Sequence, residues 1–378
     1  MSINTSRKLR VLLLSPLTYG PGFSGEDAYT QALLSYPPEG VEYIFHDDLV
    51  SSGKAYRNTW IPRIFFNLSE YRLGVLPYSW IQTLVSDEDF DLVHIHSWDA
   101  YLGGHIREIP LVISLSSSPH YGLKYYKGWS NLRVQCYGFI ISGLLRSLRV
   151  WDSFYNPGPA RRIFIWSRYQ MQFFPQYSKN VKKMRLVRPG ISLPERQTTA
   201  LHDSSIKILF IGNDFYRKGG EVLMKAFRNV RDQLGNIVSL TVITKDISTL
   251  LNVDGLKVYA SLPYQDVQAL MLDHNVLALP SLAEGYGMAV IEAMAKGLVP
   301  VVSDAGALPE IVNEGQAGMV VRVNDVDALT GALLKLTLNR DLRFHLAEEA
   351  YAYYRAEHAI DKTNDRLRLA YEDALGGR

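Results

Sequence analysis

Cysteine is almost absent from this sequence, which holds a single one, Cys136, in 378 residues. One thiol cannot form an intramolecular disulfide or a cysteine-rich metal site, so small disulfide scaffolds are excluded and a reducing compartment is favoured. An excess of charge of one sign is lacking too, because 40 basic and 38 acidic side chains leave a formal net charge of +2. That balance supplies no general field for nucleic acid, so no nucleic-acid partner is expected.

Long hydrophobic runs are also missing. No stretch reaches the roughly 18 unbroken apolar residues of a transmembrane helix, and the best candidate is interrupted by Arg146 and Arg149. The basic residues 7–10 and the apolar run after them imitate a signal peptide, but the run ends at Pro16 and favours a buried first strand. We therefore expect a cytoplasmic protein, and peripheral contact with the cytoplasmic membrane face stays open.

The chain does have a sustained alternation of short apolar runs and helical patterns, over a length that suits two domains. This rhythm is typical of parallel sheets covered by helices, so we predict an α/β fold of two doubly wound, Rossmann-like domains facing each other. Residues 1–195 form the first domain, with a closing C-terminal helix at 359–378, and residues 196–358 form the second. The polar stretch 192–205 is interpreted as the linker.

The apolar runs give a list of expected strands. The segment 51–86 is aromatic and irregular and is either a helical excursion or an acceptor-side wall, and three helices are expected from about 325 to 375. Strands are expected at 10–14, 41–46, 92–96, 110–115, 162–166 and 185–187 in the first half, and at 206–211, 239–244, 256–260, 275–280, 300–303 and 318–321 in the second.

The most informative stretch, 280–297, has the pattern strand, tight loop, helix. Gly285 and Gly287 allow a sharp turn and a close approach of backbone to ligand, and a helix beginning near Gly287 presents unpaired N–H groups and a partial positive charge. This pattern is typical of a phosphate site. Because Glu284 and Glu292 carry negative charge, they should instead accept hydrogen bonds from the hydroxyls of a sugar and a ribose. The alternative is that both are solvated charges beside an ordinary turn.

A second element, 211–220, also lies between an expected strand and a helix. A diphosphate leaving group needs fixed positive charge, which Arg217 and Lys218 can supply through a guanidinium fork and an ammonium group. The alternative is that both are solvated charges before a helix.

Together these stretches resemble the E-x7-E signature of the family 4 retaining glycosyltransferases, also called group 1 glycosyltransferases, which have the GT-B architecture. The resemblance covers nearly the full chain and is densest from 207 to 321. It implies transfer of a hexose-type sugar from a nucleotide-diphosphate donor to an acceptor hydroxyl, with retention at the anomeric carbon. The sugar nucleotide is then a substrate, and no cofactor is expected. The acceptor is a saccharide, a lipid or a small molecule. A nucleotide-sugar epimerase or hydrolase, or a non-catalytic nucleotide-sugar binding protein, is the alternative.

The resemblance also implies roles for individual residues. Glu284 matches the family glutamate that contacts the transferred sugar, Glu292 matches the one that holds the ribose, and Lys218 matches the lysine of the family's Lys-Gly pair. The family's donor phosphate and sugar contacts correspond to Gly285, Tyr286, Gly287 and Met288.

The sequence departs from the family pattern at Asn213, where an arginine is commonest, and Arg217 can take that place. Gly22 to Gly25 match a Gly-rich loop that closes over the donor phosphates in the family; a mobile surface loop is the alternative from composition.

Histidines and acidic residues of the first half give weaker signals. The strand that contains His94 and His96 resembles the family's His-x-His strand. Because side chains alternate along a strand, both histidines should face the same side of the sheet. They are either a pair of metal ligands or structural histidines. At the end of the next strand the family often has a histidine; this chain has Ser116 there, and His120 can fill the catalytic role. The Asp-x-Asp spacing in 87–91 is interpreted as a solvated turn, and we predict no required metal.

A basic, apolar segment, 121–150, has two interpretations. It is either a helix packed on the first sheet, which we favour, or an amphipathic segment that lies on an anionic membrane surface.

Overall fold

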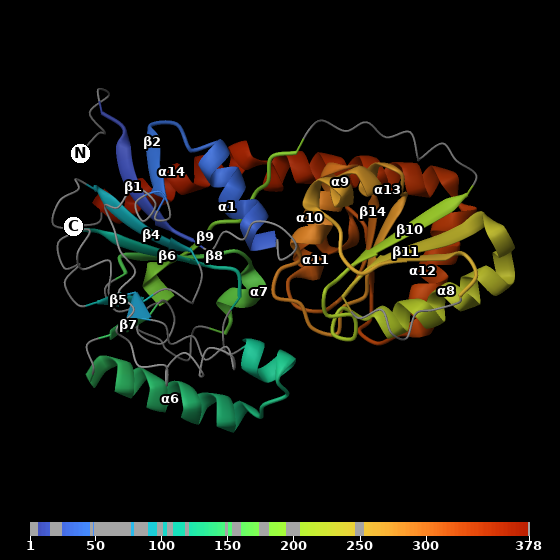
Figure 1. Ribbon diagram of the computed structural model, residues 1–378, viewed down its shortest axis with the longest axis horizontal. Helices are drawn as coiled ribbons and strands as arrows, with labels where there is room; N and C mark the ends of the chain where they lie inside the picture. The colour runs from blue at the N-terminus through green and yellow to red at the C-terminus, as the bar shows by residue number, and fades with distance from the viewer. Residues whose placement is uncertain are drawn as a thin grey trace. The chain divides into compact units, whose positions relative to one another are not determined.

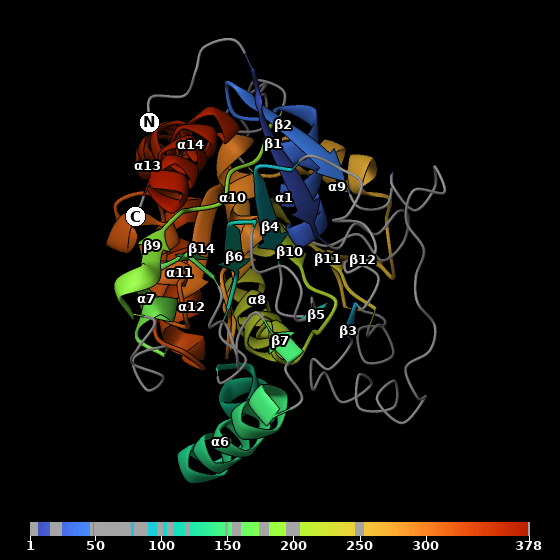
Figure 2. The same ribbon diagram turned by 90° about the vertical axis from the view of Figure 1, so that its left-hand side faces the viewer.

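In the computed structural model the chain folds into two units (Figures 1 and 2). The first unit comprises Met1–Leu17, Tyr29–Pro189 and Ile360–Arg378, and the second comprises Thr18–Ala28 and Gly190–Ala359. The structure describes residues 7–15, 25–45, 48, 77–78, 90–96, 101–103, 109–117, 121–147, 150–152, 160–173, 181–193, 205–245 and 253–376.

A six-stranded parallel sheet forms the core of the first unit. Its four inner strands are buried along most of their length, as parallel strands covered on both faces must be. The strand Leu92–His96 (β4) has the predicted bounds. Each of the other five strands differs from its expected range by one residue, at one end or at both ends. The order is β2-β1-β4-β6-β8-β9, formed by β1 (Leu9–Leu14), β2 (Val41–Phe45), β4 (Leu92–His96), β6 (Leu111–Leu115), β8 (Arg162–Ile165) and β9 (Met184–Leu186).

The remaining described elements of the first unit lie around this sheet. A three-stranded sheet, β3-β5-β7, was not expected from the sequence, and only its strand β3 falls within the segment 51–86, most of which lies outside the described residues. The elements are β3 (Pro77–Tyr78), β5 (Tyr101–Gly103), β7 (Val150–Asp152), a π-helical turn η1 (Gly122–Tyr126), α6 (Asn131–Ser147) and α7 (Arg168–Met171). Helix α1 (Gly25–Ser35) is divided between the units, because its residues up to Ala28 belong to the second and those from Tyr29 onward to the first.

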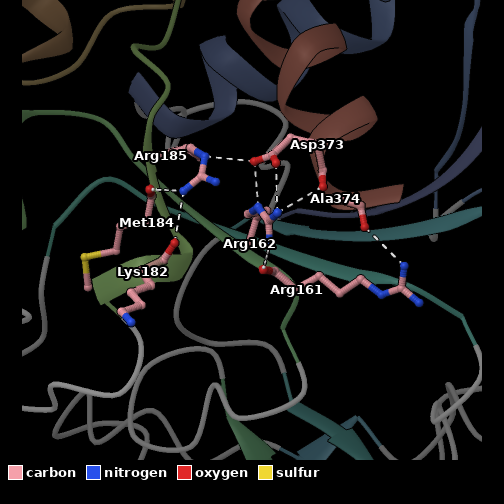
Figure 3. A network of polar contacts seen from close by, with 7 residues as sticks. All are labelled: Arg161, Arg162, Lys182, Met184, Arg185, Asp373 and Ala374. Carbon is pink, nitrogen blue, oxygen red and sulfur yellow. Dashed lines mark hydrogen bonds and ion pairs between the residues drawn. The ribbon is translucent and has the colours of Figure 1, made fainter. Parts of the chain in front are cut away.

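The C-terminal helix α14 (Ile360–Gly376) belongs to the first unit, although the preceding helices belong to the second. Figure 3 shows how its end is held: Arg162 donates from Nε and Nη2 to the two carboxylate oxygens of Asp373, at 2.6 and 2.8 Å. Arg185 Nε lies 2.8 Å from the same carboxylate. These hydrogen bonds and the neighbouring positive charges lower the pKa of Asp373 to about 2 against the cost of partial burial.

A second six-stranded parallel sheet forms the core of the second unit. The order is β12-β11-β10-β13-β14-β15, formed by β10 (Ile206–Ile211), β11 (Val238–Ile243), β12 (Leu256–Tyr259), β13 (Val276–Leu279), β14 (Val299–Ser303) and β15 (Met319–Val321). The chain therefore winds outward from β10 in one direction and from β13 in the other. The point where the direction reverses lies between these two adjacent strands, and in open α/β sheets such a point opens a crevice at the carboxyl ends of the strands.

Helices cover both faces of this sheet (Figure 1). Helices α8 and α12 pack together on one face, and α9 and α10 lie on the other. Asp325 caps α12 and Asn339 caps α13 by accepting a hydrogen bond from a backbone N–H of the first turn. The bounds are α8 (Gly220–Leu234), α9 (Tyr264–Leu272), α10 (Met288–Ala295), α11 (Leu308–Ile311), α12 (Val326–Leu338), α13 (Arg340–Tyr353), the π turn η6 (Tyr354–His358) and the 3-10 turns η4 (Gly235–Ile237) and η5 (Asn313–Gly315).

Candidate functional site

The turns that follow β10 and β13 meet at the reversal point of the second sheet. The backbone N–H of Leu282 donates to the carbonyl oxygen of Arg217 at 2.8 Å, which joins the two turns directly. Gly219 makes this approach possible. Its φ is +77°, and a Cβ there would collide with the carbonyl oxygen of Pro280. The two motifs found in the sequence therefore form one site.

Lys218 and Glu284 form a shielded ion pair at this junction. Lys218 Nζ lies 2.5 Å from Glu284 Oε2, and the two side chains are only 16% and 8% exposed. Ser281 donates to the same carboxylate oxygen at 3.3 Å. The alternative of solvated charges is therefore wrong for both residues.

The Glu284 carboxyl is held in its charged form. Burial alone would raise its pKa, but the charges of Lys218 and Arg217 and the hydrogen bonds from Lys218 and Ser281 outweigh burial and lower the pKa below its ordinary value. The carboxylate is thus fixed in place, with the ammonium group beside it.

Arg217 spans the two turns rather than extending into solvent. Its Nε donates to Asp214 Oδ2 at 2.9 Å and its Nη1 donates to the carbonyl oxygen of Ala283 at 2.9 Å. Nη1 also lies 4.0 Å from Glu284 Oε2. Its guanidinium therefore adds positive charge at the same carboxylate, while the exposed Asn213 lies at the start of the turn.

Helix α10 begins at this junction. Gly287 precedes it with a φ of +113°, and a Cβ there would lie 2.7 Å from Leu308 Cδ2, so this position requires glycine. The helix start carries no side-chain cap. The helix ends with Lys296 as its C-terminal cap, followed by Gly297 with a φ of +78°. The N-terminus of α10 thus faces the carboxyl end of the sheet with its first-turn amides uncapped by side chains.

Glu292 lies inside the unit and is only 6% exposed, so it is not a solvated charge. Gln268 Nε2 donates to its Oε2 at 3.2 Å, and the Tyr264 hydroxyl is a further hydrogen-bond partner. Burial raises the pKa of Glu292 to about 7, although both hydrogen bonds act in the opposite direction. Tyr264 and Gln268 were missed by the sequence reading; their spacing of four residues on α9, which puts them on one face, was the available signal.

The first unit holds a buried chain of polar groups around His94 and His96. Tyr371 Oη lies 2.6 Å from His94 Nδ1, and Ser114 Oγ lies 2.8 Å from His94 Nε2 and 2.7 Å from His96 Nδ1. Burial lowers the pKa of both histidines to about 3, so both rings are neutral. Among the described residues, no group of three potential metal ligands is found. These contacts favour the structural interpretation of both histidines.

This hydrogen-bond network couples the tautomers of the His94 and His96 rings. The Ser114 hydroxyl carries one hydrogen, so it donates to one histidine and accepts from the other. Both rings therefore carry their proton on Nε2, or both carry it on Nδ1. His96 Nε2 is buried and has no hydrogen-bond partner among the described residues.

The remaining predicted site residues are described by their burial and position. Tyr286 and Met288, beside the junction, are buried, and Gly25 is the half-buried first residue of α1. Gly22 and His120 lie outside the described residues.

Comparison with known proteins shows a family similarity in the second unit. Residues 193–353 match the family model described as Glycosyl transferases group 1. Over this stretch the chain is similar to the group 1 glycosyltransferases. This stretch contains the Lys218–Glu284 pair, the start of α10 and Glu292.

Curated relatives match the chain over part of their length. The chain is 35% identical over 97 residues to the lipopolysaccharide core biosynthesis mannosyltransferase LpcC of Rhizobium leguminosarum bv. viciae, across 26% of this chain and 28% of that protein. It is 26% identical over 168 residues to an uncharacterized glycosyltransferase of Methanocaldococcus jannaschii, across 44% of this chain and 47% of that protein. The chain thus spans less than half the length of these two relatives.

Solved structures match the whole chain. A sucrose-phosphate synthase from Thermosynechococcus elongatus has a TM-score of 0.68 at 15% identity, with 98% of this chain and 100% of that chain covered. Anabaena HepE, solved in complex with UDP and glucose, has a TM-score of 0.66 at 13% identity, with 97% and 100% covered. At such identities the likeness establishes the fold, which is GT-B.

Proposed function

We propose that the protein transfers a hexose-type sugar from a nucleoside diphosphate donor to an acceptor hydroxyl, with retention at the anomeric carbon. The observation that carries this proposal is the shielded Lys218–Glu284 pair at the reversal point of the second sheet. It lies within the stretch that matches the group 1 family. The names of relatives support the choice of sugar, because LpcC is a mannosyltransferase and HepE was solved with UDP and glucose.

In this proposal Lys218 stabilises the diphosphate as it leaves. Negative charge grows on the leaving group in the transition state, and a fixed ammonium group in a shielded site stabilises that charge strongly. The uncapped amides at the start of α10 and the backbone from Gly285 to Met288 bind the donor phosphates. Arg217 contributes charge through the same junction, so the mechanism relies on protein cations and requires no divalent metal.

Glu284 orients the transferred sugar by accepting hydrogen bonds from its hydroxyls. Its carboxylate already accepts hydrogen bonds from Lys218 and Ser281, which fix its position. We therefore assign it to orientation and not to attack on the anomeric carbon. Glu292 accepts hydrogen bonds from the ribose hydroxyls, and the first unit binds the acceptor, with His120 as the candidate catalytic histidine there.

Two measurements test the proposal. Thermal unfolding with a panel of nucleoside diphosphates and their sugars should give stabilisation of the wild type by one nucleotide class and loss of that stabilisation in Lys218→Ala. The exposed Lys225 lies on α8, the helix that follows Lys218 in the chain, and provides the matched control, Lys225→Ala. If no nucleoside diphosphate stabilises the wild type, the donor site is wrong. Release of the sugar without any acceptor would instead identify a hydrolase, and isomerisation of the sugar without any acceptor would identify an epimerase. Donor binding without turnover would identify a binding protein.

A further inference from the structure

Among the described side chains of helix α6, small ones are buried and several large apolar ones are exposed to solvent. Val134 and Ser142 are buried at 4% and 7% exposure. On the opposite side Leu132, Phe139 and Ile140 are 71%, 81% and 64% exposed. A helix that covers a core has the reverse arrangement, because burying Phe and Ile contributes far more than burying Ser.

The exposed apolar residues form one continuous stripe. Leu132, Cys136, Phe139 and Ile140 follow the spacing i, i+4, i+7 and i+8, which places them on one face of a helix. Cys136 is exposed as well. These four residues are called the outer stripe here. A contiguous apolar patch of this kind marks an interaction site in a protein that is not aggregating.

The position of α6 explains why the outer stripe is uncovered. We expected this helix to pack on the six-stranded sheet of the first unit, but its main contacts are with β7 and the π turn η1. Figures 1 and 2 both show α6 at the margin of the first unit, beyond the strands β5 and β7. The apolar run therefore does not serve the main core.

The surrounding segment carries charge of one sign. Residues 121–150 contain no aspartate or glutamate, and their charged residues are Lys124, Lys127, Arg133, Arg146 and Arg149. The chain as a whole is nearly balanced at +2, so this segment concentrates positive charge. Arg133 is exposed and lies over the ring of Trp129, with Cζ 4.0 Å from the ring centroid.

We propose that the outer stripe of α6 docks onto an anionic lipid surface. Leu132, Phe139 and Ile140 enter the boundary between headgroups and acyl chains, and the basic side chains of the described residues Lys124, Lys127 and Arg133 bind lipid phosphates. A second copy of the chain is a poorer occupant, because a two-fold contact through this face would place two acid-free basic segments against each other. An apolar protein partner would not account for the exclusively positive charge of residues 121–150.

Flotation of the full chain with lipid vesicles tests the proposal, using vesicles of phosphatidylcholine alone or mixed with phosphatidylglycerol. The wild type should float with the mixed vesicles, and added salt should weaken this binding. The double variant Phe139→Ser with Ile140→Ser should bind at least about tenfold more weakly. The double variant Leu338→Ser with Phe344→Ser is the matched control, because these residues are 68% and 47% exposed on other helices and its binding should be unchanged.

Lys127→Glu separates charge from apolar insertion, and it should reduce binding to the mixed vesicles only. The proposal is overturned if the wild type fails to float with the mixed vesicles, or if it binds both vesicle types equally. It is also overturned if sedimentation without lipid shows self-association that Phe139→Ser with Ile140→Ser abolishes, because the outer stripe is then a dimer interface. Thermal unfolding of each variant checks that the fold is intact. Flotation needs no sugar donor, so its outcome is independent of the proposed transferase activity.

Discussion

Replacing Glu292 by Gln should make the second unit more stable at alkaline pH. Burial raises the pKa of Glu292 from 4.5 to about 7, so at pH 8 the folded protein holds a charge that its surroundings disfavour. Gln keeps the shape of the side chain and its ability to accept from Gln268 and Tyr264, and it removes the charge. The same charge should serve donor binding, so the substitution separates stability from function.

The size of the effect follows from proton linkage. A group whose pKa is higher in the folded state than in the unfolded state contributes stability that is complete below the unfolded value and is lost as pH rises through the folded value. For Glu292 the loss runs from about pH 4.5 to pH 7, and it amounts to about 3 kcal/mol. The difference in free energy of unfolding between Glu292→Gln and wild type should therefore grow by about that amount between pH 4.5 and pH 8.

Urea denaturation followed by far-ultraviolet circular dichroism is the appropriate assay. All six tryptophans lie between residues 60 and 166, so tryptophan fluorescence reports on the first unit and serves as an internal control. Comparing variant with wild type at each pH cancels the contributions of other titrating groups, including the buried histidines. If the difference between the two proteins does not change with pH, then Glu292 is already charged in the folded protein at low pH and the reasoning fails.

The same variant tests the ribose assignment. Ribose hydroxyls that donate to Glu292 favour its charged form, so nucleoside diphosphate affinity of the wild type should rise as pH increases toward 7, by about tenfold per pH unit at most. Glu292→Gln should lack this rise and should bind more weakly at pH 8. Isothermal titration calorimetry across the pH range measures both. A wild-type affinity independent of pH would remove Glu292 from the donor site.

The other predictions concern the ion pair, metal dependence and the C-terminal helix. Lys218→Ala and Glu284→Ala should each lower kcat/KM by about two to three orders of magnitude; near wild-type rates in both, with Lys225→Ala as reference, would contradict the assignments. Chelating divalent cations should leave turnover intact, and a loss reversed by added metal would show that a metal is required. Asp373→Asn should lower the free energy of unfolding of the first unit by about 1 kcal/mol at pH 7. This difference from the wild type should shrink as pH falls from 4 toward 2, because the pKa of Asp373 lies near 2. Tryptophan fluorescence in urea measures the effect, and an unchanged unfolding midpoint at pH 7 would contradict it.

The sheets were predictable because their strands are short apolar runs bounded by polar residues, proline or glycine. The run at 206–211 gave the bounds of β10 directly, and no described strand of either main sheet departs from its expected range by more than one residue at an end. Helix α6 was harder. Its sequence is apolar on more than one face, so periodicity did not show which face is buried. The burial of Val134 and Ser142 in the structure identifies that face.

The candidate site was predictable in its parts but not in its contacts. The two Gly-containing turns identified Lys218 and Glu284 separately, one for the diphosphate and one for the sugar. These residues are 66 positions apart, and only the parallel pairing of β10 with β13 brings them within hydrogen-bond distance. Residues without a motif, such as Tyr264, were missed because a hydroxyl that stabilises a buried carboxylate has no signature in sequence.

The ion pair also constrains how a donor can bind. An ammonium group offers several N–H donors, whereas Glu284 Oε2 occupies the direction of one of them. Phosphate oxygens can therefore reach Lys218 without displacing Glu284. With the pair intact, phosphate and sugar are held by groups whose relative position is already fixed, so less ordering remains for the donor to impose. Glu284→Ala would free the ammonium for phosphate yet remove that fixed geometry. It should therefore lower kcat more than it weakens binding of the free nucleoside diphosphate, and equal losses in both would mean that Glu284 acts only by holding Lys218.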